Sequence, residues 1–537
     1  MYGPVSASFA LLGVCLHPIL KRWEPNIVRF LGLVFLATIA TCFYLVYGER
    51  CDWLGAMGLT LRAMGSCLSG LCCSIVAYRL SPLHPLAGYP GPILAKISKW
   101  WMAYWIAKGE RHLLLQRLHA QYGPWLRIGP NEISVNDPAA LRPIYGTMFR
   151  APFYQTARKE ADALVTTVDR VEHARRRIAW DKAFSTESLR GFRDMAQLRT
   201  NQLLDILLAK SKHVLPIDLS HWLSLWSMDN MGDMSFSGGF ETLAAGKDME
   251  GWMEMFSLAH VFVGIVGQTP WMHDIIMLLP QPGPIVTFQK FIAQKVLSTR
   301  ATSVEAKRNI LGIIQDESSG GPLLTSQEAA ADAALMITAG TSTVSEGATT
   351  LFRHIIGNEK IQTRLRAEIS ATFDTGDYCD PVRLTRLPYL DACVQEALRI
   401  VPPGAPAGAP RFSGNGGQIL DQYIPGGTTV ACPTYTLQRD PQNFARPDEF
   451  IPERWLPESD IKPHVPEAFH PFSYGPGVCV GKPVALYNMK LLTIRMLQKF
   501  QFSFASGFDP QKFDASYKDR STWEHDPLMV QVEELAS

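Results

Sequence analysis

The stretch Pro471–Ala485, PFSYGPGVCVGKPVA, sets the expectation for the rest of the chain. It places Cys479 among Gly475, Gly477 and Gly481, just before YNMKLLTIRMLQKF, a run with helical spacing of apolar residues. Glycines let a backbone come close to a flat ligand, and amides beside a sulfur stabilise a thiolate and tune its donor strength. The loop therefore favours a cysteine that binds a metal-bearing group over an ordinary buried cysteine.

The composition allows a large core and excludes some kinds of partner. The chain has 537 residues, 47% of them hydrophobic, and a formal net charge of +1. A field this weak gives no reason to expect a nucleic-acid partner. Six of the ten cysteines lie in the first eighty residues, and the chain has no CxxC pair. This is neither a disulfide framework nor a zinc pattern, so we expect the later part of the chain to face a reducing compartment.

Three apolar stretches occupy the first eighty residues: Ser6–Leu20, Phe30–Tyr47 and Leu54–Tyr78. The middle stretch is long enough for a hydrocarbon core of roughly 30 Å, whereas the first is short and the third carries Arg62. With three spans, Lys21, Arg22 and Arg79 would all fall on the cytoplasmic side, as the positive-inside rule expects. The sequence thus predicts a membrane anchor over residues 1–80 with one to three transmembrane helices, and it leaves their number open.

A proline-rich connector separates the anchor from the rest. Four prolines lie within residues 81–92: Pro82, Pro85, Pro90 and Pro92. Proline cannot continue a helix, so we expect a stiff, extended hinge. From residue 93 the pattern is mainly helical, with short β-like stretches at Trp125–Ile133 and Gly427–Cys432. We therefore expect one mainly α domain with small β-sheets over residues 93–537.

The cysteine loop resembles a known family signature. Phe472, Gly475, Cys479 and Gly481 match the pattern F-x-x-G-x-[RH]-x-C-x-G of cytochromes P450. The resemblance extends over about residues 85–530, and it implies the cytochrome P450 fold, with haem b (iron protoporphyrin IX) as cofactor and Cys479 as the axial ligand of the iron. Such a thiolate favours O–O cleavage. Gly477 departs from the pattern, because the family usually has Arg or His there in contact with a haem propionate.

Two further motifs occur in the family's order. Glu396 and Arg399, in QEALR, lie three residues apart and share one face of a predicted helix. As an exposed ion pair they would contribute little. With Arg454 in FIPERW they resemble the E-x-x-R and P-E-R motifs, which imply a buried Glu–Arg–Arg network. Buried charges are tolerated only when they are paired and hydrogen-bonded, so the implied role is structural.

The basic run EHARRRIAWDKAFS at residues 172–185 would ordinarily be a solvated helix face. His173 and Arg177 lie one turn apart, however, and resemble the family's W/H-x-x-x-R pattern, whose side chains bind the haem propionates. The planar fork of arginine pairs well with carboxylates. Arg411, in PPGAPAGAPR, is a further candidate for such a contact.

The run ADAALMITAGTSTVSEGATT at residues 331–350 resembles the oxygen-activating helix of the family, with its motif [AG]-G-x-[DE]-T-[TS]. Thr343 matches the threonine that directs protons, although a threonine within a helix can instead bond its own i−4 carbonyl. Ser342 occupies the usual acid position. A carboxylate relays protons from water, whereas a hydroxyl only passes them on, so Asp332 or Glu346 is an alternative source.

Together the motifs imply a haem-thiolate monooxygenase that oxidises a bulky, lipophilic small molecule with dioxygen. Electrons would come from NADPH through a separate NADPH–cytochrome reductase, because the chain has no Gly-rich dinucleotide-binding unit. Large apolar side chains between residues 220 and 275 suit a core and part of a pocket. The chain looks most like fungal microsomal members of secondary metabolism, which implies an endoplasmic reticulum membrane and a cytosolic catalytic domain.

Two alternatives are weighed against this interpretation. Ser342 at the acid position leaves open a reductase-independent haem-thiolate isomerase or dehydratase. A haem-free membrane scaffold is disfavoured, because Cys479, Thr343 and the three residues of the Glu–Arg–Arg network are all present. The substrate and the carbon that is oxidised depend on loops that no motif specifies.

Overall fold

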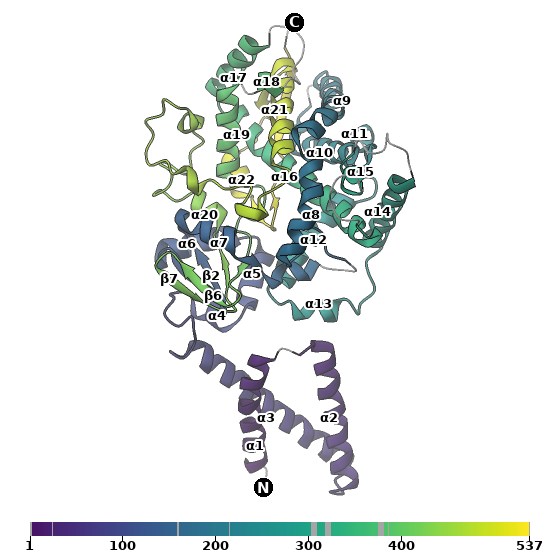
Figure 1. Ribbon diagram of the computed structural model, residues 1–537, viewed down its shortest axis with the longest axis vertical. Coiled ribbons are helices and arrows are strands. Elements are labelled where there is room, and N and C mark those ends of the chain that lie inside the picture. The colour runs from purple at the N-terminus through teal and green to yellow at the C-terminus, as the bar shows by residue number, and fades with distance from the viewer. Residues whose placement is uncertain are drawn as a thin grey trace.

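The computed structural model describes residues 3–23, 25–157, 161–213, 215–301, 309–316, 324–373, 381–384 and 386–535. Figure 1 shows a large, mainly helical body, from which three N-terminal helices extend at one end. The described residues are mainly helical and form four small β-sheets, so the predicted fold class is confirmed.

The helices, in chain order, are α1 Gly3–Arg22, α2 Ile27–Tyr47, α3 Trp53–Leu80, α4 Ile93–Ile97, α5 Trp100–Lys108, α6 Arg111–Tyr122, α7 Leu141–Thr147, α8 Arg170–Ala183, α9 Thr186–Ser211, α10 Leu219–Phe236, α11 Thr242–Ala245, α12 Trp252–Val266, α13 Trp271–Ile276, α14 Gly283–Ala301, α15 Ile310–Ile314, α16 Ser326–Ile356, α17 Glu359–Thr372, α18 Pro381–Leu384, α19 Pro388–Ile400, α20 Thr434–Gln438, α21 Lys482–Lys499 and α22 Pro510–Ala515. The strands are β1 Trp125–Gly129, β2 Glu132–Val135, β3 Phe149–Arg150, β4 Ile217–Asp218, β5 Arg411–Phe412, β6 Gly416–Ile419, β7 Gln422–Pro425, β8 Thr429–Ala431, β9 Phe500–Phe504, β10 Lys518–Asp519, β11 Trp523–Glu524 and β12 Met529–Glu534.

Helices α1 and α3 pack closely through two glycines. A Cβ added to Gly13 would lie 2.0 Å from the carbonyl oxygen of Cys67, and one added to Gly70 would lie 2.0 Å from that of Ala10. Small residues of this kind let helix backbones approach within a membrane. At the end of the two helices nearer the body, the ammonium of Lys21 on α1 lies 3.8 Å from the centre of the Tyr78 ring on α3. Helices α1 and α3 therefore run parallel.

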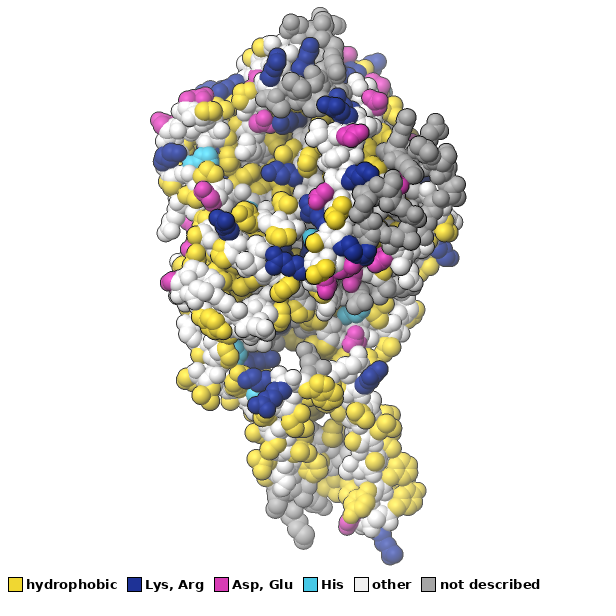
Figure 2. All heavy atoms as spheres, viewed as in Figure 1, with side chains coloured by type: hydrophobic (Ala, Val, Ile, Leu, Met, Phe, Trp, Pro, Cys, Tyr) yellow, Lys and Arg dark blue, Asp and Glu magenta, His cyan; other side chains and the backbone are white. Residues whose placement is uncertain are grey.

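Helices α2 and α3 are long and apolar enough to cross a membrane. None of the residues of α2 is buried, so its apolar side chains face outward, and Figure 2 shows hydrophobic side chains covering this part of the molecule. Within the described residues, α1 does not meet the same criteria of length and composition. The structure thus offers two candidate spans within the predicted range of one to three.

The connector after α3 is held against the body by hydrogen bonds. Residues 81–89 form successive turns, in which the amide of Ala87 donates to the carbonyl of His84 at 2.9 Å. The backbone of β1 then bonds the connector, because the amide of Arg127 donates to Pro90 at 2.7 Å. The prediction of an extended segment was therefore wrong here, because turn hydrogen bonds bend the chain between the prolines.

Helix α16 runs through the middle of the body, where it contacts α10, α14, α19 and α21 (Figure 1). It begins at a capping box in which Thr325 and Glu328 satisfy each other's backbone amides. Its 31 residues span roughly 46 Å at about 1.5 Å per residue. One helix can therefore border both the core and the cavity described below.

The largest sheet has the order β1-β2-β8-β5-β3. Strands β1, β2 and β8 coincide with the two stretches predicted to be β-like, Trp125–Ile133 and Gly427–Cys432. At the other edge, β3 pairs with β5 in an antiparallel register that places Arg150 directly opposite Arg411. Two arginines on neighbouring strands are thus held together by backbone pairing.

A buried charge network lies under α19. The two Glu396 carboxylate oxygens accept hydrogen bonds from Arg399 at 2.8 and 2.9 Å, and one of them also accepts from Arg454 at 3.0 Å. Arg399 also donates to the carbonyls of Gln438 and Pro447 at 2.8 and 2.7 Å. Burial works to raise the pKa of Glu396, but the two guanidinium groups hold that pKa below its ordinary value. The carboxylate is therefore ionised.

We expect Arg399→Ala to destabilise the fold, because it leaves Glu396 buried with fewer partners. Breaking such a pair costs about 3–5 kcal/mol, a large share of a typical stability of about 5–15 kcal/mol. Arg175→Ala is the matched control, because Arg175 pairs with Glu172 at the same helical spacing but is largely exposed. The control should change the free energy of unfolding by about 1 kcal/mol or less. Equal unfolding midpoints in urea for the two variants would contradict the structural role.

We also expect full-length protein to stay with membranes after an alkaline wash, because α2 and α3 expose apolar surface of sufficient length. A variant lacking residues 1–80 should be released, at least in part, as a folded domain. Recovery of full-length protein in the soluble fraction would refute the anchor.

Candidate active site

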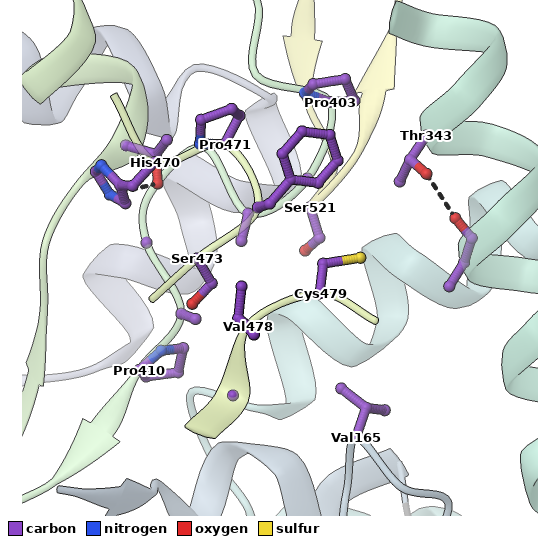
Figure 3. A pocket seen from close by; sticks show the side chains of 18 of the residues that line it. Val165, Thr343, Pro403, Pro410, His470, Pro471, Ser473, Val478, Cys479 and Ser521 are labelled. Atoms are coloured by element: carbon purple, nitrogen blue, oxygen red, sulfur yellow. Dashed lines mark hydrogen bonds between the residues drawn. The ribbon is translucent and has the colours of Figure 1, made fainter. Parts of the chain in front are cut away.

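A cavity of about 510 Å³ lies between α16 and the cysteine loop. Figure 3 shows Cys479 and Thr343 among the side chains of its wall. Apolar side chains from several parts of the chain provide most of the rest of the lining, including Phe153, Leu335, Met336 and Val484. The volume and the lining suit a large flat group together with a lipophilic molecule.

The cysteine loop is positioned by one glycine. Gly475 has a φ of +69°, and a Cβ at that position would lie 2.6 Å from the carbonyl oxygen of Tyr145 on α7. Only glycine allows this backbone conformation and this close approach together. The amide of Cys479 donates to the carbonyl of Phe472 at 2.9 Å, which closes the loop. Gly481 has no comparable steric requirement, since its Cβ would make only ordinary contacts.

The Cys479 side chain is exposed to the cavity, although the surrounding protein encloses it. Burial raises the pKa of the Cys479 thiol, while the amides of Gly481 and Lys482 and the charge of Arg177 act in the opposite direction. A coordinated metal ion deprotonates a thiol outright. The loop therefore fits a metal ligand better than a free nucleophile, for which the pKa would have to be lowered.

Three arginines line the cavity beside this loop: Arg150, Arg177 and Arg411. Arg177 donates to the carbonyl of Val478 at 2.8 Å and pairs with Asp181 at 2.7 Å. Among the described residues, neither Arg150 nor Arg411 forms an ion pair with a carboxylate. Burial lowers the pKa of Arg150 to about 10, which still leaves it charged at neutral pH.

His173 completes this cluster as a neutral group. Its Nε2 accepts a hydrogen bond of 3.1 Å from Arg150. Burial, together with the neighbouring arginines, lowers the pKa of His173 to about 4. The imidazole therefore adds no charge at neutral pH, and it orients the Arg150 guanidinium.

The cluster requires an anion. Like charges directly opposite each other on paired strands are destabilising, and an unpaired buried charge is costly. Arg150 and Arg411 face each other in this way; Arg411 is buried and Arg150 is partly buried. Two carboxylates on the edge of a flat group, as in haem, would offset these charges through charge-assisted hydrogen bonds. The residues present therefore fit a haem group, with its propionates toward the arginines and its iron toward Cys479.

Arg411 occupies the space beside Gly477, the position at which this chain departs from the family signature. A Cβ added to Gly477 would lie 2.9 Å from Nη2 of Arg411. The guanidinium also stacks over the ring of Tyr145 at 4.9 Å and donates to the hydroxyl of Tyr154 at 3.4 Å. A side chain at position 477 would displace this flexible guanidinium, which β5 places beside the cysteine loop.

On α16, both hydroxyls of the expected proton path bond their own helix. Thr343 donates to the carbonyl of Ala339 at 2.7 Å (Figure 3), and Ser342 donates to that of Thr338 at 3.2 Å. Thr343 lines the cavity, whereas Ser342 does not. The i−4 bonding that the sequence left open is therefore present at both positions.

The two alternative acids both have partners. Asp332 is fully buried, and it accepts from Arg176 at 2.6 Å and from the amide of Leu164 at 2.7 Å. It does not line the cavity, so it holds α8 and the segment before it against α16 rather than serving the cavity.

Glu346 lies one turn beyond Ser342 on α16, and its Oε2 is 3.2 Å from Nε2 of His525. The two side chains form an ion pair. Burial alone would lower the pKa of His525, but the Glu346 carboxylate raises it to about 9. Of the two acids, only Glu346 has a titratable neighbour through which it could exchange a proton.

Sequence reasoning missed Arg150, whereas residues 220–275 form core and a small part of the cavity wall, as expected. Arg150 belongs to no recognised motif, and only the pairing of β3 with β5 brings it to the cluster. Among the large apolar residues of the 220–275 segment, only Met231 lines the cavity. Others, such as Trp226 and Met228, are fully buried in the core.

Comparison with known proteins decides the family. A sequence model of the family described as Cytochrome P450 matches residues 90–531. The chain is a cytochrome P450. It is 31% identical to "Cytochrome P450 monooxygenase FCK2" of Fusarium pseudograminearum (strain CS3096), over 96% of this chain and 95% of the relative. It is also 31% identical to "Tryprostatin B 6-hydroxylase" of Aspergillus fumigatus, over 94% of this chain and 91% of the relative. It is 30% identical to "Cytochrome P450 67" of Uromyces fabae, over 95% of each chain.

Membership of the family identifies the chain as an oxidoreductase that incorporates oxygen, and it implies haem, a redox partner, dioxygen and a lipophilic substrate. The fold is the cytochrome P450 fold that the motifs predicted. The predicted site residues Phe472, Gly475, Gly481 and Thr343 lie around the same cavity or its cysteine loop.

We expect Arg411→Ala to weaken the retention of haem, because it removes a cation from the cluster. The loss of one charge-assisted hydrogen bond, about 1.5–3 kcal/mol, corresponds to haem transfer to an acceptor protein that is roughly 10–100 times faster. Gly477→Ala should act in the same direction by displacing Arg411. Gly417→Ala is the control, because a Cβ there meets no atom within 4 Å. Unchanged haem transfer from Arg411→Ala would contradict this role.

Proposed function

We propose that this cytochrome P450 inserts one oxygen atom from dioxygen into a bulky, lipophilic small molecule, with Cys479 as the axial ligand of its haem iron. The observation that carries the proposal is a cysteine open to the cavity beside two facing arginines, Arg150 and Arg411, which have no carboxylate partner among the described residues. A haem group satisfies both at once, because it offers a metal to the sulfur and two carboxylates to the arginines.

Each side chain of the cysteine loop and the basic cluster then has a role. Arg150, Arg177 and Arg411 hold the propionates, and neutral His173 orients Arg150. The amide of Gly481 and the backbone of the cysteine loop tune the sulfur. When bound, haem supplies the oxygen chemistry, while the protein positions the substrate and supplies protons.

Proton supply is assigned to α16. The Thr343 hydroxyl faces the cavity and would move protons after rotating away from the carbonyl of Ala339. Ser342 extends this path by one more hydroxyl. Glu346 provides the acid, since it lies one helical turn from Ser342 and contacts His525, which is close to the surface. The carboxylate is thus displaced by one turn from its usual place in the family.

Electrons would reach the haem from NADPH through a separate NADPH–cytochrome reductase. The apolar helices α2 and α3 support attachment to the endoplasmic reticulum membrane, with the catalytic domain in the cytosol. Lys21 at the end of α1 and Arg79 at the end of α3 both lie near the body, which agrees with a cytosolic side there. The fungal relatives named above support a role in secondary metabolism.

One observation favours a second candidate, a haem-thiolate isomerase or dehydratase that needs no reductase. Ser342 replaces the acid of the oxygen-activating motif, and Asp332 is committed to Arg176. An enzyme that rearranges its substrate does not need that acid. The two candidates differ in whether oxygen from dioxygen enters the product.

The test incubates membranes containing the protein and a fungal reductase with NADPH, a panel of lipophilic metabolites and isotopically labelled dioxygen. We expect mass spectrometry to find products that gain one labelled oxygen, and only when both reductase and NADPH are present. Heat-inactivated membranes are the control. Unlabelled products that form equally well without the reductase would reject the monooxygenase and support the isomerase or dehydratase.

A further inference from the structure

One wall of the cavity carries an amide without a hydrogen-bond partner. Gln268 follows the last turn of α12, lines the cavity and is only 7% exposed. No hydrogen bond joins its side chain to any residue that the structure describes. Its Oε1 is enclosed by protein, so a rotation of the amide brings that oxygen to the cavity. A buried polar group in this state is destabilising, and native proteins rarely leave one without a reason.

A hydroxyl on the same wall comes from the turn between β10 and β11. Ser521 lines the cavity and has a φ of +76°, a conformation that is strained for a residue with a side chain. Its backbone is held at both ends, because its amide donates to Asp519 at 3.0 Å and its carbonyl accepts from Ala405 at 3.1 Å. In the described part of the chain, its Oγ has no hydrogen-bond partner. The fold therefore presents this hydroxyl to the cavity in a fixed position.

Close packing places the Ser521 hydroxyl against the backbone that precedes Gln268. A Cβ added to Gly264, one helical turn before Gln268, would lie 3.3 Å from Oγ of Ser521. A Cβ added to Gly267 would lie 2.2 Å from the ring of Phe153. The Ser521 hydroxyl and the Phe153 ring therefore both pack against the backbone of residues 264–267, which directly precedes Gln268.

Among the residues that the structure describes, the wall around these groups carries no free charge. Arg111 lines the cavity but forms a bidentate ion pair with buried Asp519, with both contacts at 2.9 Å. Glu132 also lines the cavity and pairs with Lys99 at 2.8 Å. The arginines without such pairs belong to the basic cluster beside the cysteine loop. A ligand group at this wall therefore meets neutral donors and acceptors.

We propose that Gln268 and Ser521 form a neutral polar subsite for a carboxamide or lactam of the substrate. A carboxamide offers one acceptor and two donors, and a hydroxyl offers one donor with two acceptor lone pairs. A group that both donates and accepts can satisfy the two side chains together. The subsite would anchor one end of an otherwise apolar molecule, and so determine which of its carbons faces Thr343. This inference rests on the proposed function, because it requires haem in the same cavity.

The test uses the haem-loaded full-length protein and imidazoles that carry an alkyl arm. The imidazole binds the haem iron and shifts its absorbance, while the arm extends into the cavity. A series of arm lengths is compared in pairs that end in a primary carboxamide or in a methyl group. At one arm length we expect the carboxamide to bind about ten-fold more tightly than the methyl partner, as expected for one or two neutral hydrogen bonds.

Gln268→Met should abolish this preference and leave the affinity for the methyl-ended arms unchanged, because methionine fills similar space without a hydrogen-bonding amide. Gln315→Met is the matched control, because Gln315 is another amide without a hydrogen-bond partner but does not line the cavity. The control should keep the full preference.

Equal affinities for both endings at every arm length would overturn the subsite alone, since the shift itself would still show haem in the cavity. A preference that survives Gln268→Met would also overturn it. No shift with imidazole itself would reject the proposed haem site, and the subsite with it.

Discussion

The cavity of this cytochrome P450 depends on one electrostatic constraint. Backbone pairing of β3 with β5 places Arg150 directly opposite Arg411, and no described carboxylate pairs with either. The strands cannot separate to relieve the repulsion without giving up their hydrogen bonds to the sheet. The protein therefore carries a fixed positive cluster that only an anion can neutralise, and the loop of Cys479 lies beside it. Folding and cofactor binding are coupled, because a ligand that binds only the folded state also stabilises that state.

The same constraint explains why the departure at position 477 is tolerated. In the family pattern a basic side chain extends from the cysteine loop, but here the loop has Gly477 and the charge comes from Arg411. The guanidinium is held by the ring of Tyr145 and the hydroxyl of Tyr154. The cluster therefore keeps Arg411 beside Gly477, although the basic residue that the family pattern has at position 477 is absent. Ser342 is a comparable departure on α16, where Glu346 offers an acid one turn further along.

Local motifs could be predicted from the sequence and long-range pairings could not. The cysteine loop, the helix that carries Thr343 and the pair Glu396–Arg399 each depend on residues within one short segment, so resemblance to the family's short motifs identified them. Arg150 became visible only through strand pairing with a residue far along the chain. Gln268 has no motif, because its significance lies in the hydrogen bonds that it does not make. The connector was predicted as extended from its prolines, whereas the turns between them follow from hydrogen bonds that composition does not reveal.

The central claim is that Cys479 binds the haem iron as a thiolate. The most direct measurement is the absorbance spectrum of the reduced, carbon-monoxide-treated protein, compared between Cys479→Ser and Cys432→Ser. Cys432 is a fully buried cysteine that does not line the cavity. The account predicts the red-shifted Soret band of a thiolate ligand in the wild type and in Cys432→Ser, and its loss in Cys479→Ser. A red-shifted band that persists in Cys479→Ser would show that another residue is the ligand, and would contradict the account.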